Sequence, residues 1–551
     1  MAHKNKNMAD NYDDYSREEL IRELRLRDRR PRFGLVWERK EIEHEKAVND
    51  DFVTLDFDPA LSCGEAPYRN LIIEGDNFDA LRYLRMTHAG KVKCIYIDPP
   101  YNTGNRDFIY NDRFVDKDDA YRHSKWLEFM NRRLLLAREL LAEEGVIFVS
   151  IDDGEGANLR LLMDSIFGEN NFLACIAWEK RYTRSNNAKL FYSLKDWIIV
   201  FRTSPAVATM KEARTAKADA NFSNPDNDPS GAWMTCSYVN PATKEKRPNL
   251  VYPIFSPKEI EIKHPTHAWK YSMTEHERHK AENRLWWGNN NDAMYPRLKL
   301  YLSETKGMVP IDLWSYKDSG TTDDGGNEIK DIFGEAVFDN PKPTQLIERI
   351  LRIATTPGDI VLDFFAGSGT TAHAVMRLNA EDDGNRRFIL VSCAEATESE
   401  PDKNLCRDVC AERARRVSLG YTNKKGEAVT GMGGGFAYFR TQRHPTETLF
   451  NSIQHEAIWT ALQLIHAETV SLFEPNALIQ RLEYGNTTVL YLPKINDAVL
   501  NGMKSLIAKG SILVIYSWQP GLLRQHFEDD RISFLPIPQF LVDRFGNRGI
   551  A

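Results

Sequence analysis

The sequence predicts an α/β fold built around a largely parallel sheet. The apolar run at residues 92–97 ends at Asp98-Pro99-Pro100-Tyr101, and the apolar run at residues 360–363 ends at a glycine-rich loop before a helix-like segment. Such largely apolar runs are typical of strands that are buried on both faces of a sheet. Residues 205–335 interrupt this alternation of strands and helices with turn clusters, so we expect an insert in the sheet.

The remaining elements follow in chain order. A capping box opens a highly charged helix at residues 16–30, which either contacts DNA or a partner or is a solvated surface helix. We expect a strand and loop at 71–77, with a helix from Phe78, then a helix at 121–143 and a strand at 146–151. After the glycine-rich loop comes a strand at 387–393. The tail predicts a helix at 453–468, a strand at 488–492, a helix at 497–508 and a strand at 512–518.

The Asp98–Tyr101 loop carries groups suited to a planar substrate with an amino group. Two prolines remove two backbone donors and fix φ, which leaves a rigid turn with a carboxylate, free carbonyls and a flat ring. The amino hydrogens can donate to Asp98 and to the Pro99 carbonyl, while Tyr101 stacks on the flat face. A nucleobase taken out of its stack fits this description. A turn that only terminates a strand is the alternative reading of the same residues.

The downstream loop is typical of a cofactor site. Gly367 and Gly369 permit positive φ and a close approach of a ligand to the backbone, and the following helix offers free amide donors at Thr370 and Thr371. The loop lacks the third glycine of a dinucleotide fingerprint and the lysine of a phosphate-binding P-loop. Glu395 follows the next strand, where an acid binds ribose hydroxyls in sheets of this kind or is simply a solvated loop residue.

Together these residues resemble the β class of adenine-specific, S-adenosylmethionine-dependent DNA methyltransferases. In that class the Asp-Pro-Pro-Tyr loop comes first, a long insert follows and the glycine loop comes last. Residues 145–153, 340–343, 384–390 and 433–436 are also similar to the modification subunits of type III restriction systems. The resemblance covers roughly residues 70–205 and 335–440. The chain departs from it at Lys195-Asp196, where that family often has a histidine, and in its last hundred or so residues.

The resemblance implies a Rossmann-like sheet that transfers a methyl group from S-adenosyl-L-methionine to N6 of a flipped adenine in duplex DNA, without a metal. The implied catalytic residues are Asp98, Pro99, Pro100 and Tyr101. The implied cofactor-binding residues are Asp76, Asn77, Asp98, Lys342, Pro343, Asp363, Phe365, Ala366, Gly367, Gly369, Thr370, Thr371 and Glu395. The predicted DNA-binding residues are Asn102, Arg181, Arg184 and Lys189.

The same order of motifs predicts five regions. They are an N-terminal charged helical arm (1–60), the first part of the catalytic domain (61–204), a target-recognition domain (205–335), the second, cofactor-binding part of the catalytic domain (336–445) and a small α/β assembly domain (446–551). The insert carries many interleaved aromatic residues, so a structural subdomain with ordinary core tryptophans is its alternative interpretation. Its histidines at 264, 267, 276 and 279 do not form a known zinc signature.

Composition restricts the class of protein. The chain has 551 residues and a formal net charge of −7, so DNA contact must rely on a local basic surface. Seven cysteines without paired short spacing indicate reduced thiols, and no apolar run is long enough to span a membrane. We therefore expect a cytoplasmic enzyme. The expected partners are double-stranded DNA, a second copy of the chain in a homodimer, and a restriction or helicase subunit of the same defence system.

Three other functions remain open from the sequence. Methylation of cytosine N4 uses the same geometry, although serine is common there at the position of Asp98. A DNA-reading scaffold that positions a separate nuclease or helicase would need no intact catalytic loop. A Rossmann oxidoreductase is disfavoured because the third glycine is missing.

Overall fold

The computed structural model describes residues 37, 51–104, 109–110, 113–114, 121–184, 189–396, 400–445, 449, 453–507 and 511–546. The predicted helix at 16–30 lies outside these residues. The chain forms two compact units: a main unit from the described parts of Met1–Val207, Asp312–Leu351 and Thr355–Ala551, and an inserted unit from Ala208–Ile311 with Arg352–Ala354.

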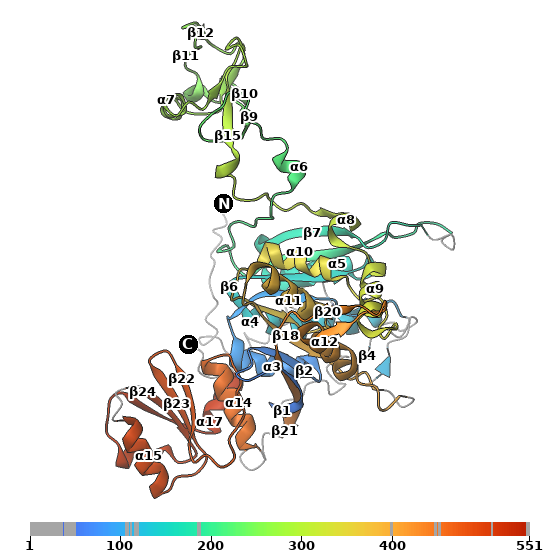
Figure 1. Cartoon of the computed structure of the whole chain (residues 1–551), viewed down its shortest axis with the longest axis vertical. Coiled ribbons are helices and arrows are strands. Elements are labelled where there is room, and N and C mark those ends of the chain that lie inside the picture. Colours follow the sequence, from blue (N-terminus) through green and yellow to red (C-terminus); the bar gives the residue numbers. More distant parts are fainter. Residues whose placement is uncertain are drawn as a thin grey trace, which may run out of the picture. The chain divides into compact units, whose positions relative to one another are not determined.

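A ten-stranded mixed sheet forms the centre of the main unit (Figure 1). Its spatial order is β1-β21-β2-β18-β17-β3-β6-β8-β7-β16. The neighbours from β21 to β6 are all parallel, whereas β1, β8 and β7 pair with antiparallel partners. The strands are β1 (Phe52–Cys63), β2 (Asn70–Glu74), β3 (Val92–Ile97), β6 (Leu141–Ile151), β7 (Phe172–Glu179), β8 (Lys195–Arg202), β16 (Leu313–Trp314), β17 (Ile360–Asp363), β18 (Arg387–Ser392) and β21 (Phe436–His444).

The helices of the main unit form two groups. In one group α3 and α5 both pack on α4, and in the other α9 and α11 both pack on α12. The helices are α3 (Asn77–His88), α4 (Arg122–Leu140), α5 (Gly156–Phe167), α8 (Tyr316–Ser319), α9 (Thr322–Phe333), α10 (Thr344–Ala354), α11 (Thr370–Asp382) and α12 (Glu412–Leu419), with a π-helical turn η5 (Cys406–Ala411) before α12 and a 3-10 turn η2 (Glu169–Asn171). Two short strand pairs complete this part, β4 (Ile109–Tyr110) with β5 (Arg113–Phe114) and β19 (Gly420–Thr422) with β20 (Ala428–Thr430). The predicted α/β fold class is confirmed.

The structure moves one predicted boundary in the first half of the sheet. The helix expected at residues 121–143 ends at Leu140, and the strand expected from residue 146 begins at Leu141. The reason is tertiary: Leu141 already pairs with Val92 of β3, so the chain is extended before the apolar run starts.

The inserted unit has its own small core of buried Tyr238, Ile254, Trp269, Trp287 and Leu298. Its elements are α6 (Ala216–Asp219), β9 (Trp233–Ser237), β10 (Val239–Thr243), η3 (Pro248–Leu250), β11 (Ile254–Phe255), β12 (Glu261–Ile262), β13 (His267–Trp269), α7 (Met273–Ala281), β14 (Leu285–Trp286), β15 (Arg297–Tyr301) and η4 (Leu302–Glu304). The expected insert ran to residue 335, but residues 312–335 belong to the main unit. There β16 adds a parallel strand beside β7, and the Trp178 indole donates to the Gly320 carbonyl at 3.0 Å.

The tail forms the predicted small α/β element. Its four-stranded sheet has the order β22-β23-β24-β25. The elements are α14 (His455–His466), β22 (Gln480–Tyr484), β23 (Thr487–Leu492), α15 (Asp497–Ile507), β24 (Ile512–Ser517), α16 (Pro520–His526), β25 (Ile532–Pro536) and α17 (Gln539–Phe545). One face of this sheet shares its core with the main unit, since Tyr491 and Tyr516 belong to the same buried cluster as Leu84 of α3. Among the described residues, no helix combines the length and apolar character needed to cross a membrane.

Candidate active site

Three carboxylates gather at one edge of the central sheet. Asp76 follows β2, Asp98 follows β3 and Asp363 ends β17, and these strands belong to one parallel set. The carboxyl ends of parallel strands lie at the same edge, which is where α/β sheets bind their ligands. The structure thus brings together the two loops that the sequence singled out more than 260 residues apart.

Asp98 has one oxygen occupied and one available. Its Oδ2 accepts a hydrogen bond from Lys342 Nζ at 2.5 Å. Its Oδ1 is buried and has no hydrogen-bond partner among the residues that the structure describes. A buried acceptor without a donor is costly, so this atom is suited to receive an N–H from a ligand. The Lys342 ammonium also lies 5.2 Å from the centre of the Tyr101 ring.

Packing and hydrogen bonds hold the rest of this loop. The Trp126 indole donates to the Pro100 carbonyl at 2.7 Å. The Tyr101 hydroxyl donates to Asp196 Oδ2 at 3.3 Å, and Lys180 Nζ binds the other oxygen of Asp196 at 2.7 Å. Burial, followed by the charges of Asp98 and Asp196, raises the pKa of Tyr101 well above its usual range. The tyrosine therefore stays neutral, and its ring is fixed beside Asp98.

Asp196 was noted in the sequence only as a departure from the expected histidine. In the structure Asp196 is 3% exposed, and its carboxylate joins the Asp-Pro-Pro-Tyr loop to the hairpin formed by β7 and β8. No spacing rule identifies such a residue, because its partner Tyr101 lies 95 positions earlier in the chain.

Asn102, which the sequence predicted to contact DNA, is 3% exposed in the structure. Its amide donates to Glu155 Oε1 at 2.6 Å, and the same carboxylate contacts His123 Nδ1 at 2.6 Å. Asn102 has a positive φ of 57°, a conformation that asparagine tolerates better than most residues. Its side chain is directed into the protein, where it fixes the end of the loop, so a direct contact with DNA does not follow from this geometry.

The glycine-rich loop has the predicted backbone. Gly367 and Gly369 have φ values of 49° and 75°, and a Cβ at Gly369 would lie 2.8 Å from the Cys410 carbonyl oxygen. Asp363 accepts from Thr371 Oγ1 at 2.6 Å and from the Phe365 amide at 3.1 Å. Burial raises the pKa of Asp363 to about 7, although these two hydrogen bonds lower it. Both oxygens are engaged inside the protein, so Asp363 holds the loop.

The loop after β2 is fixed against the glycine-rich loop. Asp76 caps α3 by accepting from the amides of Phe78 and Asp79. Asn77 donates to the Phe364 carbonyl at 2.8 Å, and Arg133 binds Asn77 and Asp76 at 2.5 and 3.2 Å. Side-chain hydrogen bonds therefore join the predicted residues on these two loops.

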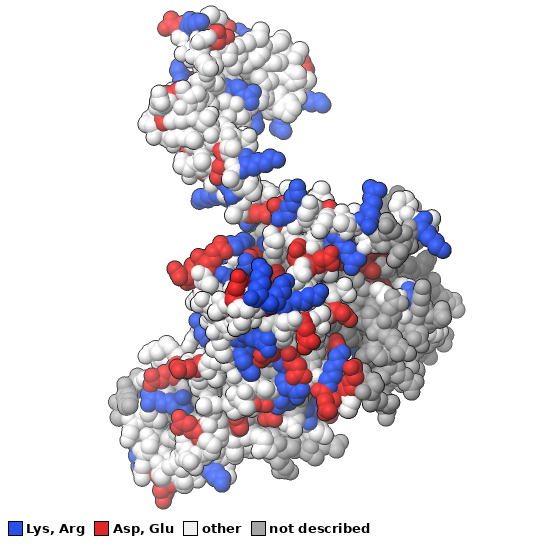
Figure 2. Space-filling view, turned by 45° about the vertical axis from the view of Figure 1, so that its right-hand side comes forward, with Lys and Arg blue, Asp and Glu red and all other residues white. Residues whose placement is uncertain are grey.

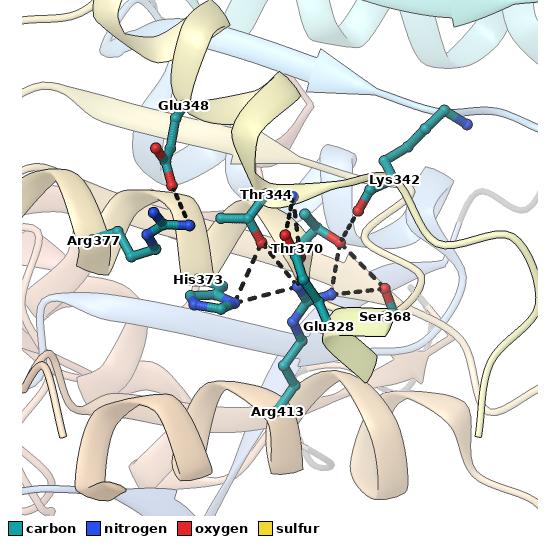
Figure 3. A network of polar contacts seen from close by, with 9 residues as sticks. All are labelled: Glu328, Lys342, Thr344, Glu348, Ser368, Thr370, His373, Arg377 and Arg413. Atoms are coloured by element: carbon teal, nitrogen blue, oxygen red, sulfur yellow. Dashed lines mark hydrogen bonds and ion pairs between the residues drawn. The ribbon is translucent and has the colours of Figure 1, made fainter. Parts of the chain in front are cut away.

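A buried arginine that the sequence did not indicate organises this edge of the sheet (Figure 3). Arg413, fully buried on α12, donates through Nη1 to Ser368 and Thr370, and through Nη2 to Glu328 and Thr344, at 2.8–3.2 Å. Thr370 in turn donates to the Lys342 carbonyl at 3.2 Å. Arg413 thus connects the glycine-rich loop to the Asn340-Pro-Lys-Pro343 segment, whose lysine holds Asp98.

Glu395 and the basic residues have more exposed positions. Glu395 lies on the loop after β18, has a φ of 55° and pairs with Lys403 at 3.3 Å. Arg181 contacts the Tyr192 hydroxyl at 2.6 Å, whereas Arg184 and Lys189 are exposed in the connection between β7 and β8. On the face shown in Figure 2, basic and acidic side chains are interspersed over the main unit.

The histidines of the inserted unit serve its core. His276 and His279 are buried, and both lie within 3.2 Å of the Tyr238 hydroxyl. Burial lowers the pKa of each imidazole. Within the described ranges, no group of three or more His, Cys, Asp or Glu side chains could hold a metal ion.

Comparison with known proteins gives consistent similarities. A family model described as DNA methylase matches residues 92–399. The StyLTI Mod subunit of a type III restriction-modification enzyme from Salmonella typhimurium strain LT2 is 34% identical over 69% of this chain and 61% of its own length. The EcoPI Mod subunit from Escherichia phage P1 is 32% identical over 59% of this chain and 57% of its own, and the type II methyltransferase M.KpnI from Klebsiella pneumoniae is 33% identical over 58% and 79%. The chain thus spans about three fifths of the length of the two Mod subunits.

Proposed function

Because this chain belongs to the DNA methylase family, whose model matches more than half of it, we propose that it transfers a methyl group from S-adenosyl-L-methionine to N6 of an adenine in duplex DNA. This membership agrees with the family resemblance expected from the sequence. The observation that carries the proposal is the buried, unpartnered Oδ1 of Asp98 at the carboxyl end of β3. An exocyclic amine supplies the N–H donor that this atom lacks.

The residues of the loop position the amine. Asp98 Oδ1 accepts one amino hydrogen, and the Pro99 carbonyl accepts the other, which keeps the nitrogen lone pair out of conjugation with the base. Lys342 holds the carboxylate through Oδ2, and the fixed Tyr101 ring stacks on the base. The target must leave the duplex to reach these groups. Most of the rate enhancement then comes from orientation and preorganised charge.

The glycine-rich loop and the loop after β2 are the proposed cofactor site. When bound, the sulfonium cofactor supplies an activated methyl group. Gly367 and Gly369 leave space beside the backbone, the first turn of α11 offers amides, and Asp76 and Glu395 supply carboxylates at the ends of neighbouring strands. Asp363, Thr371 and Arg413 keep this loop in shape. Of the remaining predicted residues, Phe365 and Ala366 lie in the glycine-rich loop and Thr370 begins α11, whereas Lys342 and Pro343 lie in the segment before α10.

A methyl-transfer assay tests the reaction. Purified protein, tritiated cofactor and genomic DNA should give labelled DNA, and mass spectrometry of its nucleosides should show N6-methyladenine. N4-methylcytosine as the product would identify the cytosine reaction instead, which Asp98 disfavours. Sequence-dependent DNA binding without any methylated product would identify a scaffold.

We further propose that the inserted unit reads the DNA sequence. It has a core of its own, so removing Ala208–Ile311 and bridging the gap should leave a main unit that binds cofactor. Sequence preference should be lost, while weak, salt-sensitive DNA binding remains through Arg181, Arg184 and Lys189. A deletion variant that binds cofactor and still methylates one sequence only would assign recognition to another region.

The proposed partners follow from the relatives' names. Two of them are Mod subunits of restriction-modification enzymes, so a restriction or helicase subunit is the proposed partner of this chain, along with duplex DNA and a second copy in a homodimer. We place this activity in the cytoplasm. Sedimentation of the purified chain tests the dimer, and co-purification from the native host tests the second subunit.

A further inference from the structure

The connection between β7 and β8 carries an apolar pair that no fold requirement explains. Leu190 and Phe191 are 93% and 101% exposed, the largest exposures among the large apolar side chains of the described residues. A single exposed leucine is ordinary, but two adjacent, fully exposed large side chains lose apolar burial for no gain within the chain. Such a pair needs an external partner.

The base of this hairpin is joined to the proposed catalytic loop. Glu179 of β7 pairs with Lys195 of β8, and the Arg181 amide donates to the Leu194 carbonyl at 3.3 Å. The buried Asp196 then binds Lys180 on the hairpin and Tyr101 on the loop. The described ends of this connection, in teal, extend away from the sheet in Figure 1.

Charge indicates the kind of partner. Arg184 and Lys189 are exposed on the two sides of the connection, and Lys189 directly precedes the apolar pair. Cations beside an exposed apolar pair match a nucleic-acid duplex, which offers phosphates outside and base faces inside. Phe191 is five residues from Asp196, so an extended chain places it at most about 18 Å from the residue that holds Tyr101.

We propose that Leu190 and Phe191 form a wedge that enters the duplex where the target adenine leaves it. Apolar side chains inserted between base steps unstack them, and the unpaired partner base regains a stacking surface on Phe191. The hairpin thereby couples extrusion of the base to its capture by Asp98 and Tyr101. This inference rests on the proposed methyl transfer to a flipped base.

The test uses full-length protein and a duplex with 2-aminopurine at the target, in the site defined by sequencing methylated DNA. The double variant Leu190→Ser/Phe191→Ser should lower the fluorescence increase on binding by about tenfold, because extrusion loses its wedge. Its affinity for S-adenosyl-L-methionine should stay within about twofold of wild type. Leu472→Ser, at a leucine that is 54% exposed in the tail, is the matched control and should behave as wild type.

Two further measurements separate a wedge from a general loss of binding. A mispaired target already has a lower cost of extrusion, so it should restore methylation by the double variant to within about threefold of wild type. Phe191→Trp should keep the activity, and its added tryptophan emission should be quenched on DNA.

Specific outcomes would overturn the wedge. One is a 2-aminopurine fluorescence increase in the double variant that equals that of wild type. Another is a mispaired target that does not restore methylation by the double variant. A third is a double variant that loses self-association but keeps the fluorescence increase, which would assign the pair to a protein interface. A wild-type protein that methylates no DNA would overturn both the proposed methyl transfer and the wedge. If wild type methylates DNA and the double variant extrudes the base equally well, only the wedge is overturned.

Discussion

Each unit contains a buried cation that binds several side chains, but the two cations differ in how many structural elements they connect. In the inserted unit Lys299, 1% exposed, binds Asp226 and Asp228 at 2.6 Å each, and Tyr301 completes the cluster with a bond to Asp228. All of these residues lie within that unit. In the main unit Arg413 instead joins residues from α9, α10, α11 and the glycine-rich loop.

The difference separates a self-contained subdomain from a site. The lysine network joins residues of the inserted unit. The arginine network fixes the positions of loops that meet at the carboxyl ends of β17 and β3. We therefore expect changes in the main network to alter ligand binding, and changes in the inserted unit to alter its own stability and DNA selection.

The largest expected effect is the loss of chemistry in Asp98→Ala. Removing the carboxylate takes away the acceptor for the amine, so methyl transfer should fall by at least about a thousandfold. Affinity for S-adenosyl-L-methionine should stay within about tenfold, or ~1.4 kcal/mol, in calorimetry. Asp226→Ala, which removes a carboxylate from the inserted unit, should keep kcat within about threefold at saturating DNA. Full activity in Asp98→Ala would contradict the mechanism.

The next effect concerns cofactor affinity and compares two glycines that both have a positive φ. In Gly367→Val the new side chain lies in the proposed cofactor space and meets Phe338, whose Cζ is 3.1 Å from the Cβ position, so affinity should fall by about a hundredfold or more. Gly231 of the inserted unit also has a positive φ, of 95°, but nothing lies within 4 Å. Gly231→Val should therefore cost stability by strain alone and leave cofactor binding unchanged. Equal binding in both variants would remove the glycine-rich loop from the site.

The third prediction tests the two cations directly. Arg413→Met removes one donor from the Glu328 carboxylate, which keeps the Thr344 amide and hydroxyl, and removes the guanidinium from the Ser368, Thr344 and Thr370 hydroxyls. It should lower the free energy of unfolding of the main unit by about 3 kcal/mol. Cofactor affinity should fall with it. Lys299→Met should destabilise the inserted unit and spare cofactor affinity. Hydrogen exchange resolves the two units, and a Lys299→Met variant with weakened cofactor binding would break the distinction between the networks.

The fourth prediction is a pH dependence of opposite sign in the two units. Burial raises the pKa of Asp363 to about 7, so the folded main unit binds the Asp363 proton more tightly than the unfolded chain does. The contribution of protonated Asp363 to stability is therefore lost as pH rises from about 4 to about 7. Asp228 is the reverse case: burial raises its pKa, but hydrogen bonds from Lys299, Ser230 and Tyr301 lower it to about 2. Its contribution is present above about pH 4 and is lost as pH falls toward 2.

Denaturant unfolding across this range checks both signs. Asp363→Asn should flatten the decline in stability between pH 4 and 7, and Asp228→Asn should flatten the loss of stability below pH 4. If the free energy of unfolding declines by the same amount between pH 4 and 7 in wild type and in Asp363→Asn, the assignment to Asp363 is wrong.

Local patterns in the sequence were enough to predict the central strands β2, β3, β6, β17 and β18 and the two key loops, but not β1, β7 or β21. The runs before Asp98 and Asp363 are buried strands because every residue in them except Lys93 is apolar or aromatic. The glycines at 367 and 369 take the positive φ that their loop requires. The order of these motifs also indicated the family. The roles of the individual site residues stay predictions, because the structure shows where they lie and not what they bind.

Residues whose partners are distant in the chain could only be found in the tertiary structure. Lys342 reaches Asp98 across 244 positions, and Arg413 and Asp196 find their partners only when the sheet has assembled. The same holds for β16, which is too short to identify alone and becomes a strand because β7 is beside it, and for the tail, whose core is shared with α3. Sequence periodicity records whether a residue faces the interior, whereas the identity of its neighbour depends on the order in which strands pair.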